Sequence, residues 1–93
     1  MIEKLYAIYD SKVKQYAKPL HTINTEVAIR AFKTECENTN SDLNRYPEDF
    51  TLFELGEFNT ETGQYKNLNT PHSVSRATDF NQSKPPGVDN AKT

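Results

Sequence analysis

Metal binding or imidazole chemistry would depend on three side chains, because the sequence holds two histidines and one cysteine. His21, Cys36 and His72 lie far apart in the chain, and none belongs to a C-x-x-C, H-x-x-x-H or H-E-x-x-H motif. Zinc sites in short motifs are usually built with such spacings. An isolated histidine or cysteine is more often a surface or core residue than a ligand, so we expect no metal site and no cofactor.

Catalytic motifs are also missing from the sequence. Three scattered glycines are too few for a G-x-G-x-x-G turn or a P-loop, and no strand-turn-helix elbow presents a serine nucleophile. Glu48 and Asp49 are adjacent, which favours a solvated acidic turn over a catalytic pair. Asn59, Glu61 and Gly63 resemble part of a calcium loop, but their order differs from that of an EF-hand. We therefore predict that the protein is not an enzyme.

Aromatic and basic side chains are the remaining candidates for function, because together they could bind unpaired bases. Aromatic rings stack on any base, and lysines neutralise the phosphates. The candidate DNA-binding residues are Lys4, Tyr6, Tyr9, Lys12, Lys14, Tyr16, Lys18, Tyr65 and Lys66. The alternative is that nearly all the rings are core or subunit contacts, and that the turn with Lys12 and Lys14 is only solvated.

Charge is unevenly distributed along the 93 residues, although the formal net charge is only −2. Residues 1–33 carry six basic and three acidic residues, so this segment is positive. Residues 34–63 carry one basic and eight acidic residues, and residues 64–93 carry four basic and two acidic residues. A protein that bound nucleic acid by phosphate neutralisation alone would be basic overall. Any DNA binding must therefore be local, through the basic segments together with stacking.

The length corresponds to one domain, which we place at residues 1–80, followed by a polar tail at residues 81–93. A core this small gives marginal stability, so we expect a homo-oligomer. No run of about 18 apolar residues could span a membrane, and the N-terminus lacks the basic and apolar regions of a signal peptide. A single cysteine excludes a disulfide framework and fits a reducing compartment.

One helix is predicted by the hydrophobic pattern within residues 22–40. Asn24 or Thr25 can cap its N-terminus. The polar run at residues 38–44 contains poor helix formers and should end it. Its apolar stripe consists of Ala28, Ile29, Phe32 and Cys36, flanked by Val27 and Ala31.

Two hairpins are predicted on either side of this helix. The first joins residues 3–10 to residues 15–21, with Pro19 at an edge or strand end because it cannot donate to a ladder. The second joins residues 50–58 to residues 64–68 through a turn in which Gly63 can take a positive φ. Residues 45–50 are expected to form a turn or a single helical turn with Pro47 at its first position.

The predicted fold class is therefore α+β, in the order β-β-α-β-β. It is an antiparallel sheet of two hairpins with one helix packed on one face and a disordered C-terminal tail at residues 81–93. In the third strand, alternation places Phe53 and Leu55 on one face, and Leu52, Phe58 and, if the strand reaches it, Phe50 on the other. Residues 69–80 are expected to form a short helix or an extended arm.

A single helix can cover only one face of such a sheet. The aromatic side chains of the other face would form an apolar patch larger than monomers usually expose. This patch could be a subunit interface, a stacking platform for bases, or both.

Three segments of the chain follow a specific order and spacing over roughly residues 4–75. They are "KLYAIYDSKVKQYAKPLHTINTEVAIRAFK", "YPEDFTLFELGEFNTETGQY" and "TPHSV". Together they resemble the small non-structural protein of the gokushovirus branch of the microviruses, which are single-stranded-DNA bacteriophages. That family has a "YxVYD" strand, a "PF…N…A(I/V)R(A/S)F" segment and a "PEDFxLFxLGxFDxxTG" block. Leu20 stands where the family usually has Phe, and Asn59 where it has Asp.

The resemblance implies a non-structural protein linked to viral DNA replication in the host bacterial cytoplasm, and it supplies no catalytic residues. We therefore expect an oligomeric accessory that binds single-stranded DNA through the tyrosines and lysines of the first hairpin. The acidic segment at residues 34–63 would face away from DNA, or pair with a basic partner such as the hairpin of a second subunit.

The alternative is a protein-protein adaptor that never touches DNA. It would bind a viral replication or procapsid protein, or a host factor, and open sheet edges suit such a role. Salt distinguishes the two functions, because DNA binding weakens steeply with salt and an apolar interface does not.

Overall fold

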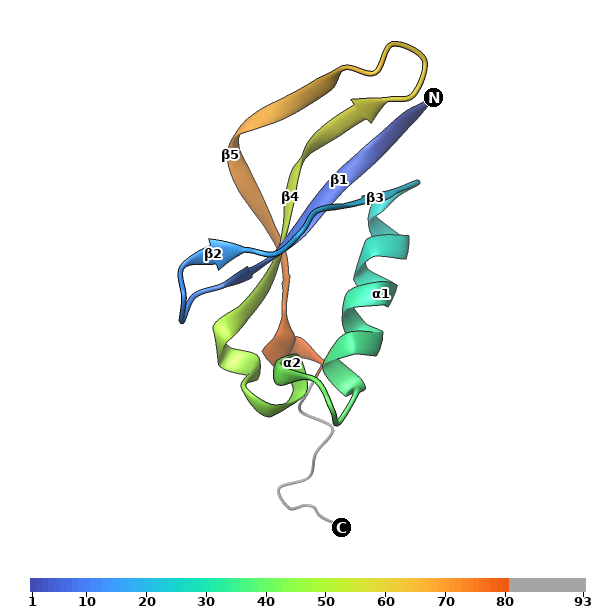
Figure 1. The fold of residues 1–93 in the computed structure, drawn as a ribbon. Helices are drawn as coiled ribbons and strands as arrows, with labels where there is room; N and C mark the ends of the chain where they lie inside the picture. The colour runs from blue at the N-terminus through green and yellow to red at the C-terminus, as the bar shows by residue number, and fades with distance from the viewer. Residues whose placement is uncertain (81–93) are drawn as a thin grey trace.

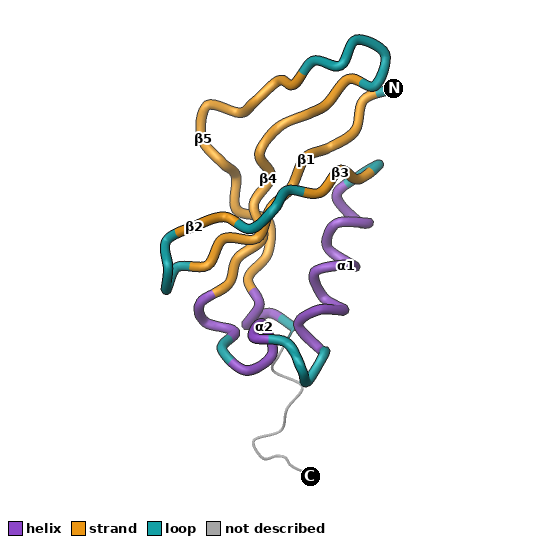
Figure 2. Tube along the Cα trace, in the orientation of Figure 1, coloured by secondary structure: helices purple, strands orange, loops and turns teal. Residues whose placement is uncertain are grey.

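The protein was analysed as a computed structural model, which describes residues 1–80. It forms one antiparallel sheet with one long helix packed on one face, so the predicted α+β fold is confirmed (Figure 1, Figure 2). The disordered tail predicted at residues 81–93 lies outside the described residues. The elements are β1 (Ile2–Asp10), β2 (Gln15–Tyr16), β3 (Leu20–Thr22), α1 (Thr25–Glu37), α2 (Asp42–Arg45), the 3-10 turn η1 (Pro47–Asp49), β4 (Phe50–Asn59), β5 (Tyr65–Arg76) and the 3-10 turn η2 (Ala77–Asp79).

Strand β1 lies in the middle of the sheet, whose order is β2-β1-β4-β5 with β3 also paired to β1. The predicted second strand is interrupted, because Pro19 falls between β2 and β3. Both short strands nevertheless pair with the same edge of β1, at Tyr9↔Tyr16 and Leu5↔His21. The expectation that Pro19 marks a strand end is therefore confirmed.

Strand β4 contains a bulge that changes which of its side chains share a face. Leu5 of β1 lies opposite Gly56, whereas Tyr6 lies opposite Glu54, so Leu55 is an extra residue in β4. A bulge reverses the alternation beyond it. The prediction that Phe58 shares a face with Leu52 is therefore wrong, and Phe58 lies on the face of Phe53.

Strand β5 is longer than the predicted return strand at residues 64–68. It pairs with β4 up to Asn67↔Gly56, is interrupted at residues 68–71, and resumes at His72↔Glu54. Pro71 in the interruption cannot donate a ladder hydrogen bond. After Arg76 the chain forms η2, so the segment expected to be a helix or an arm contains an edge strand followed by a single turn.

Helix α1 follows the predicted cap and stripe. The side chain of Asn24 accepts a hydrogen bond of 3.0 Å from the Val27 amide, and Ala28, Phe32 and Cys36 are buried while Ile29 is half-buried. The single turn predicted at Pro47 is present as a 3-10 turn.

A second short helix, α2, lies inside the polar run that was predicted only to end α1. Its N-cap Ser41 accepts a hydrogen bond of 3.2 Å from the Leu43 amide, and Leu43 is buried in the core. The capping serine and the buried leucine act together with the Arg45 guanidinium, which donates to the carbonyl oxygens of Thr39 and Asn40.

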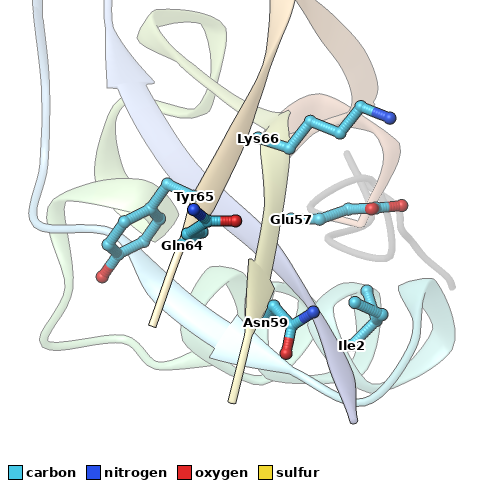
Figure 3. Close-up of a pocket in the computed structure, with 6 residues that line it drawn as sticks. All are labelled: Ile2, Glu57, Asn59, Gln64, Tyr65 and Lys66. Carbon is cyan, nitrogen blue, oxygen red and sulfur yellow. The ribbon is translucent and has the colours of Figure 1, made fainter. Parts of the chain in front are cut away.

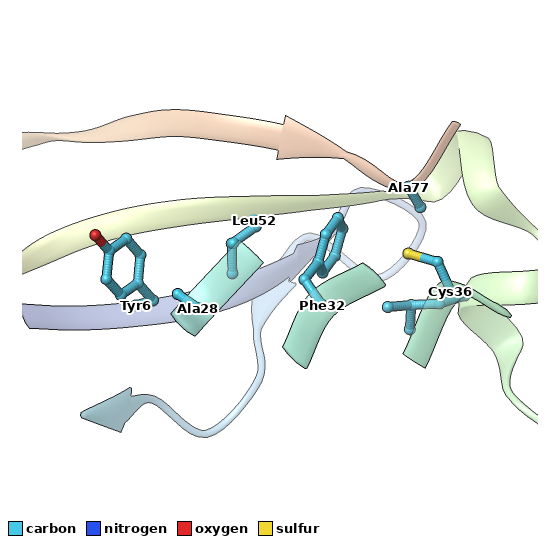
Figure 4. Packing of buried hydrophobic residues seen from close by; sticks show 7 residues of the cluster. Tyr6, Ala28, Phe32, Cys36, Leu52 and Ala77 are labelled. Atoms are coloured by element: carbon cyan, nitrogen blue, oxygen red, sulfur yellow. The ribbon is translucent and has the colours of Figure 1, made fainter. Parts of the chain in front are cut away.

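The core lies between α1 and the sheet (Figure 4). Its buried members are Tyr6, Ala28, Phe32, Cys36, Leu43, Leu52 and Ala77. From the C-terminal side, Phe80 packs edge-on against Phe32 at 6.1 Å between ring centroids. The 13 residues of α1 span about 20 Å, against about 34 Å for the 10 residues of β4. The outer ends of β1, β4 and β5 accordingly extend past the helix in Figure 1. No helix within residues 1–80 has the length and apolar composition to cross a bilayer.

Replacing Gly56 with alanine tests the close approach of β5 to the bulge. A Cβ at this position would overlap the Lys66 carbonyl oxygen and lie 2.9 Å from the Asn67 Cα, and neither backbone can move freely in a paired strand. We expect Gly56→Ala to lower the free energy of unfolding by about 1–3 kcal/mol in urea denaturation. The matched variant is Gly63→Asn, at a turn with φ 75° and open space around the Cβ, where we expect less than about 0.5 kcal/mol. Equal losses would contradict the close approach.

The buried thiol of Cys36 makes stability depend on pH. Burial and the nearby carboxylates of Glu35 and Glu37 raise its pKa from 9.0 to about 11. Below pH 9 the thiol is protonated in both states, but between pH 9 and 11 only the unfolded chain releases the proton, so stability falls as pH rises. Between about pH 8 and pH 10.5, we expect the native chain to lose about 1–2 kcal/mol more than Cys36→Ala. Urea midpoints with identical pH dependence for both chains would refute this.

Candidate nucleic-acid interface

The sheet face opposite α1 is not covered by any helix within residues 1–80, and we call it the open face. Side chains alternate along a strand, and residues paired across strands share a face, so the registers identify its members. Only Glu3 and Arg76 carry charge at its register positions, and they lie at opposite ends of the sheet. Its other members are Leu5, Ala7, Tyr9, Tyr16, His21, Thr51, Phe53, Gly56, Phe58, Tyr65, Asn67 and Ser73.

Three rings gather on the open face beside the β1–β2 turn, and we call them the hairpin cluster. The ring centroids are 4.8 Å apart for Tyr9 and Tyr16, 5.7 Å for Tyr16 and Phe53, and 6.0 Å for Tyr9 and Phe53. The contacts of Phe53 are edge-on, which is a favourable geometry for aromatic rings. Tyr16 remains 43% exposed, so the cluster presents a ring that is supported by its neighbours and accessible to solvent.

A second group of rings, the distal cluster, lies on the same face toward the far end of the sheet. His21 lies 5.2 Å from Phe58 and 5.9 Å from Tyr65, and the two carbocyclic rings are 4.7 Å apart. The His21 Nε2 atom and the Tyr65 hydroxyl group share a hydrogen bond of 3.3 Å. Tyr65 is 55% exposed. Tyr9 of the hairpin cluster and Leu5, which pairs with His21 of the distal cluster, are four positions apart in β1, which corresponds to about 13 Å.

Three of the predicted lysines flank the hairpin cluster. Lys18 is exposed in the segment that joins Tyr16 of one cluster to His21 of the other. Lys12 and Lys14 are exposed in the turn at the end of the hairpin, where the Lys12 amide donates to Asp10 Oδ1 at 2.9 Å and the Lys14 amide to the Asp10 carbonyl at 2.8 Å. Lys14 has a positive φ of 60°, and the two hydrogen bonds to Asp10 hold the turn in this conformation.

Tyr6 is a correction to the predicted site. It is fully buried against α1, and its hydroxyl group shares a hydrogen bond of 2.6 Å with Thr25 Oγ1. A ring in this position belongs to the core and cannot stack on a base.

Lys4 and Lys66 also lie on the helix side of the sheet, away from the rings of the two clusters. Lys4 Nζ forms ion pairs with Glu54 at 3.5 Å and Glu57 at 3.7 Å, and the carboxylate of Glu54 is the main cause of its raised pKa. Lys66 lies opposite Glu57 in the register. In Figure 3 the ring of Tyr65 points away from Glu57 and Lys66, on the other side of the strands.

The shallow pocket drawn in Figure 3 has a volume of about 270 Å³ and lies at the end of the sheet. Its walls bring together one acid, Glu57, and one base, Lys66, with no nucleophile beside them. Among the described residues, no group of three or more His, Cys, Asp and Glu side chains is placed to hold a metal ion.

Three members of the clusters were not among the predicted site residues. Phe53 could have been found, because strand alternation alone places it away from Leu52. Phe58 could not, because the bulge at Leu55 reverses its face. No sequence pattern indicated that His21 would contact another ring, because only the pairing of β3 with β1 brings it next to Phe58.

Comparisons with known proteins place the chain in one family. The family model described as "Phage ORF5 protein" matches residues 3–80, which is most of the chain and all but the first two described residues. Neither the search of curated proteins nor the search of solved structures found a match. The chain therefore belongs to the Phage ORF5 protein family and is a bacteriophage protein.

Proposed function

We propose that this phage protein is the small non-structural protein of a gokushovirus-type microvirus and that it binds single-stranded DNA during genome production. The presence of two aromatic clusters on the one uncovered face of the sheet carries the proposal. The resemblance of residues 4–75 to the gokushovirus protein supports the same role. The proposal is for a binding protein and assigns no catalytic residue.

The exposed rings of Tyr16 and Tyr65 would stack on unpaired bases. Each ring is already held by contacts of about 5–6 Å with two neighbouring rings, so little side-chain freedom is lost on binding. A duplex keeps its bases stacked inside, and therefore an aromatic surface of this kind favours single strands.

Phosphates would be met by lysines at the edge of this face. Lys18 lies between the two clusters along the chain and is the main candidate, while Lys12 and Lys14 remain candidates beside the hairpin cluster. The acids of β4 do not oppose this, since Glu54 and Glu57 are on the helix side and pair with Lys4. A net charge of −2 is thus compatible with local DNA binding.

Fluorescence anisotropy of labelled oligonucleotides tests the proposal. We expect Tyr16→Ala and Tyr65→Ala each to weaken single-strand binding by about 1–3 kcal/mol, roughly 5- to 150-fold, because each removes a stacking ring. Tyr46→Ala is the matched control, since Tyr46 is also 55% exposed but lies between α2 and η1, away from the open face. Tyr6→Phe should leave DNA affinity unchanged and affect only stability.

The same titration should also be run at different salt concentrations and with single-stranded and duplex oligonucleotides. The native chain should prefer single strands to duplex, and its affinity should fall about tenfold between about 50 and 200 mM salt if two or three phosphates are contacted. Lys18→Glu should reduce both the affinity and the salt dependence. Absence of binding at low salt, or equal losses for Tyr46→Ala and Tyr65→Ala, would overturn the proposal.

The second candidate function is a protein-protein adaptor for a viral replication or procapsid protein, or for a host factor. The edge strand β5 favours it, because its 12 residues leave one row of backbone groups without a neighbouring strand in the sheet. Such an edge can accept a strand from a partner. Salt-insensitive binding of a partner protein, without oligonucleotide binding, would support this function.

A further inference from the structure

A groove opens on the helix side of the molecule, between α1, α2 and the first hairpin. It consists of two cavities of about 360 and 280 Å³, and both are lined by Ile8 and Leu43. The larger cavity continues along α1 past Ala31, and the smaller one continues under the hairpin to Phe50. The shared residues make the two cavities one continuous, mostly apolar surface on the helix side, and Tyr16 of the hairpin cluster lines its hairpin end.

The charged residues lining this groove are all acidic. Glu35 lines the larger cavity and Asp10 lines the smaller one, and no lysine or arginine lines either. Nearby Asp42 is already paired with Arg45 at 3.0 Å, so it contributes less. An occupant that fits should therefore present an apolar side chain flanked by positive charges.

The tip of the β1–β2 hairpin in this same chain has that chemistry. Val13 is 59% exposed and stands between Lys12 and Lys14, both exposed. The hydrogen bonds from the Lys12 and Lys14 amides to Asp10 hold the turn in one shape, so little order has to be created on binding.

We propose that the groove receives the hairpin tip of a second copy of the chain, forming a two-fold dimer. In each partner, Val13 enters the apolar groove while Lys12 and Lys14 meet Glu35 and Asp10. A two-fold interface requires donor and acceptor surfaces that can engage reciprocally. Val13 also lines the hairpin end of the groove in its own chain, so the tip and the groove adjoin and can both lie at one two-fold axis.

Other occupants match the groove less well. Residues 81–93 contain one large aliphatic side chain, Val88, and no aromatic ring, so they offer little to fill an apolar groove. Nucleic acid would be repelled by Glu35 and Asp10. The groove lies on the helix side, and only its hairpin end, which Tyr16 also lines, borders the open face. The dimer would therefore leave the distal cluster free, and it would occupy Lys12 and Lys14, which the DNA-binding proposal also uses.

The test is the mass of the full chain in solution, measured by sedimentation at about 1 to 100 μM. We expect the native chain to approach twice its 10.6 kDa, and Val13→Asp to raise the dimer dissociation constant at least about tenfold. The matched control is Val27→Asp on α1, because Val27 is 46% exposed and lies outside the groove. A monomeric native chain, or equal effects of the two substitutions, would overturn the proposal.

Charge reversal separates this role of the lysines from a role in DNA binding. The double variant Lys12→Glu with Lys14→Glu should weaken the dimer, and so should Glu35→Lys alone. The three substitutions combined should restore at least half of the dimer fraction that the double variant loses. Circular dichroism and urea denaturation of each variant are the controls for folding, and we expect these exposed substitutions to leave the fold intact. If the double lysine variant keeps the native mass and loses only oligonucleotide affinity, the lysines contact DNA and the dimer proposal fails.

Discussion

The extra residue at Leu55 in β4 determines which side chains of this strand lie together. Before the bulge, Phe53 faces away from α1; after it, Phe58 does so too, because the alternation is reversed. Without the bulge, Phe58 would point to the helix side and the distal cluster would not form. Gly56 makes the bulge compatible with β5, since any side chain there would collide with the backbone at Lys66 and Asn67.

The bulge also separates the rings from the acids of the segment "YPEDFTLFELGEF", because it changes which side chains of β4 share a face. Glu54 and Glu57 flank the bulge and both lie on the helix side, where Lys4 pairs with them. Phe53 and Phe58 lie on the open face, which has charge only at its two ends. A strand with strict alternation could not place residues 54 and 57 together on one face and residues 53 and 58 on the other.

The local features were predictable because short-range physics fixes them. The Asn24 cap, the stripe of Ala28, Phe32 and Cys36, and the turn at Pro47 follow from spacing within a few residues. The bulge, the continuation of β5 to Arg76 and the burial of Tyr6 depend on pairing between distant segments, which periodicity does not contain. Tyr6 and Tyr9 clearly fall on opposite faces in the sequence. Only the packing of α1 decides which of them becomes core, and for that reason the predicted site contained Tyr6 together with Lys4 and Lys66 of the same face.

The helix side is left incompletely filled because α1 is short relative to the sheet and is lined by small residues. Ala28 is buried and Ala31 is exposed, and both line the cavity that stays open beside Ile8 and Leu43. A chain of this size has little stability in reserve, so apolar surface of this kind is best covered. Covering it with the hairpin of a second copy would add buried area and leave the distal cluster of the open face accessible. Association would then use the helix side and ligand binding the aromatic side, with Tyr16 at the border between the two.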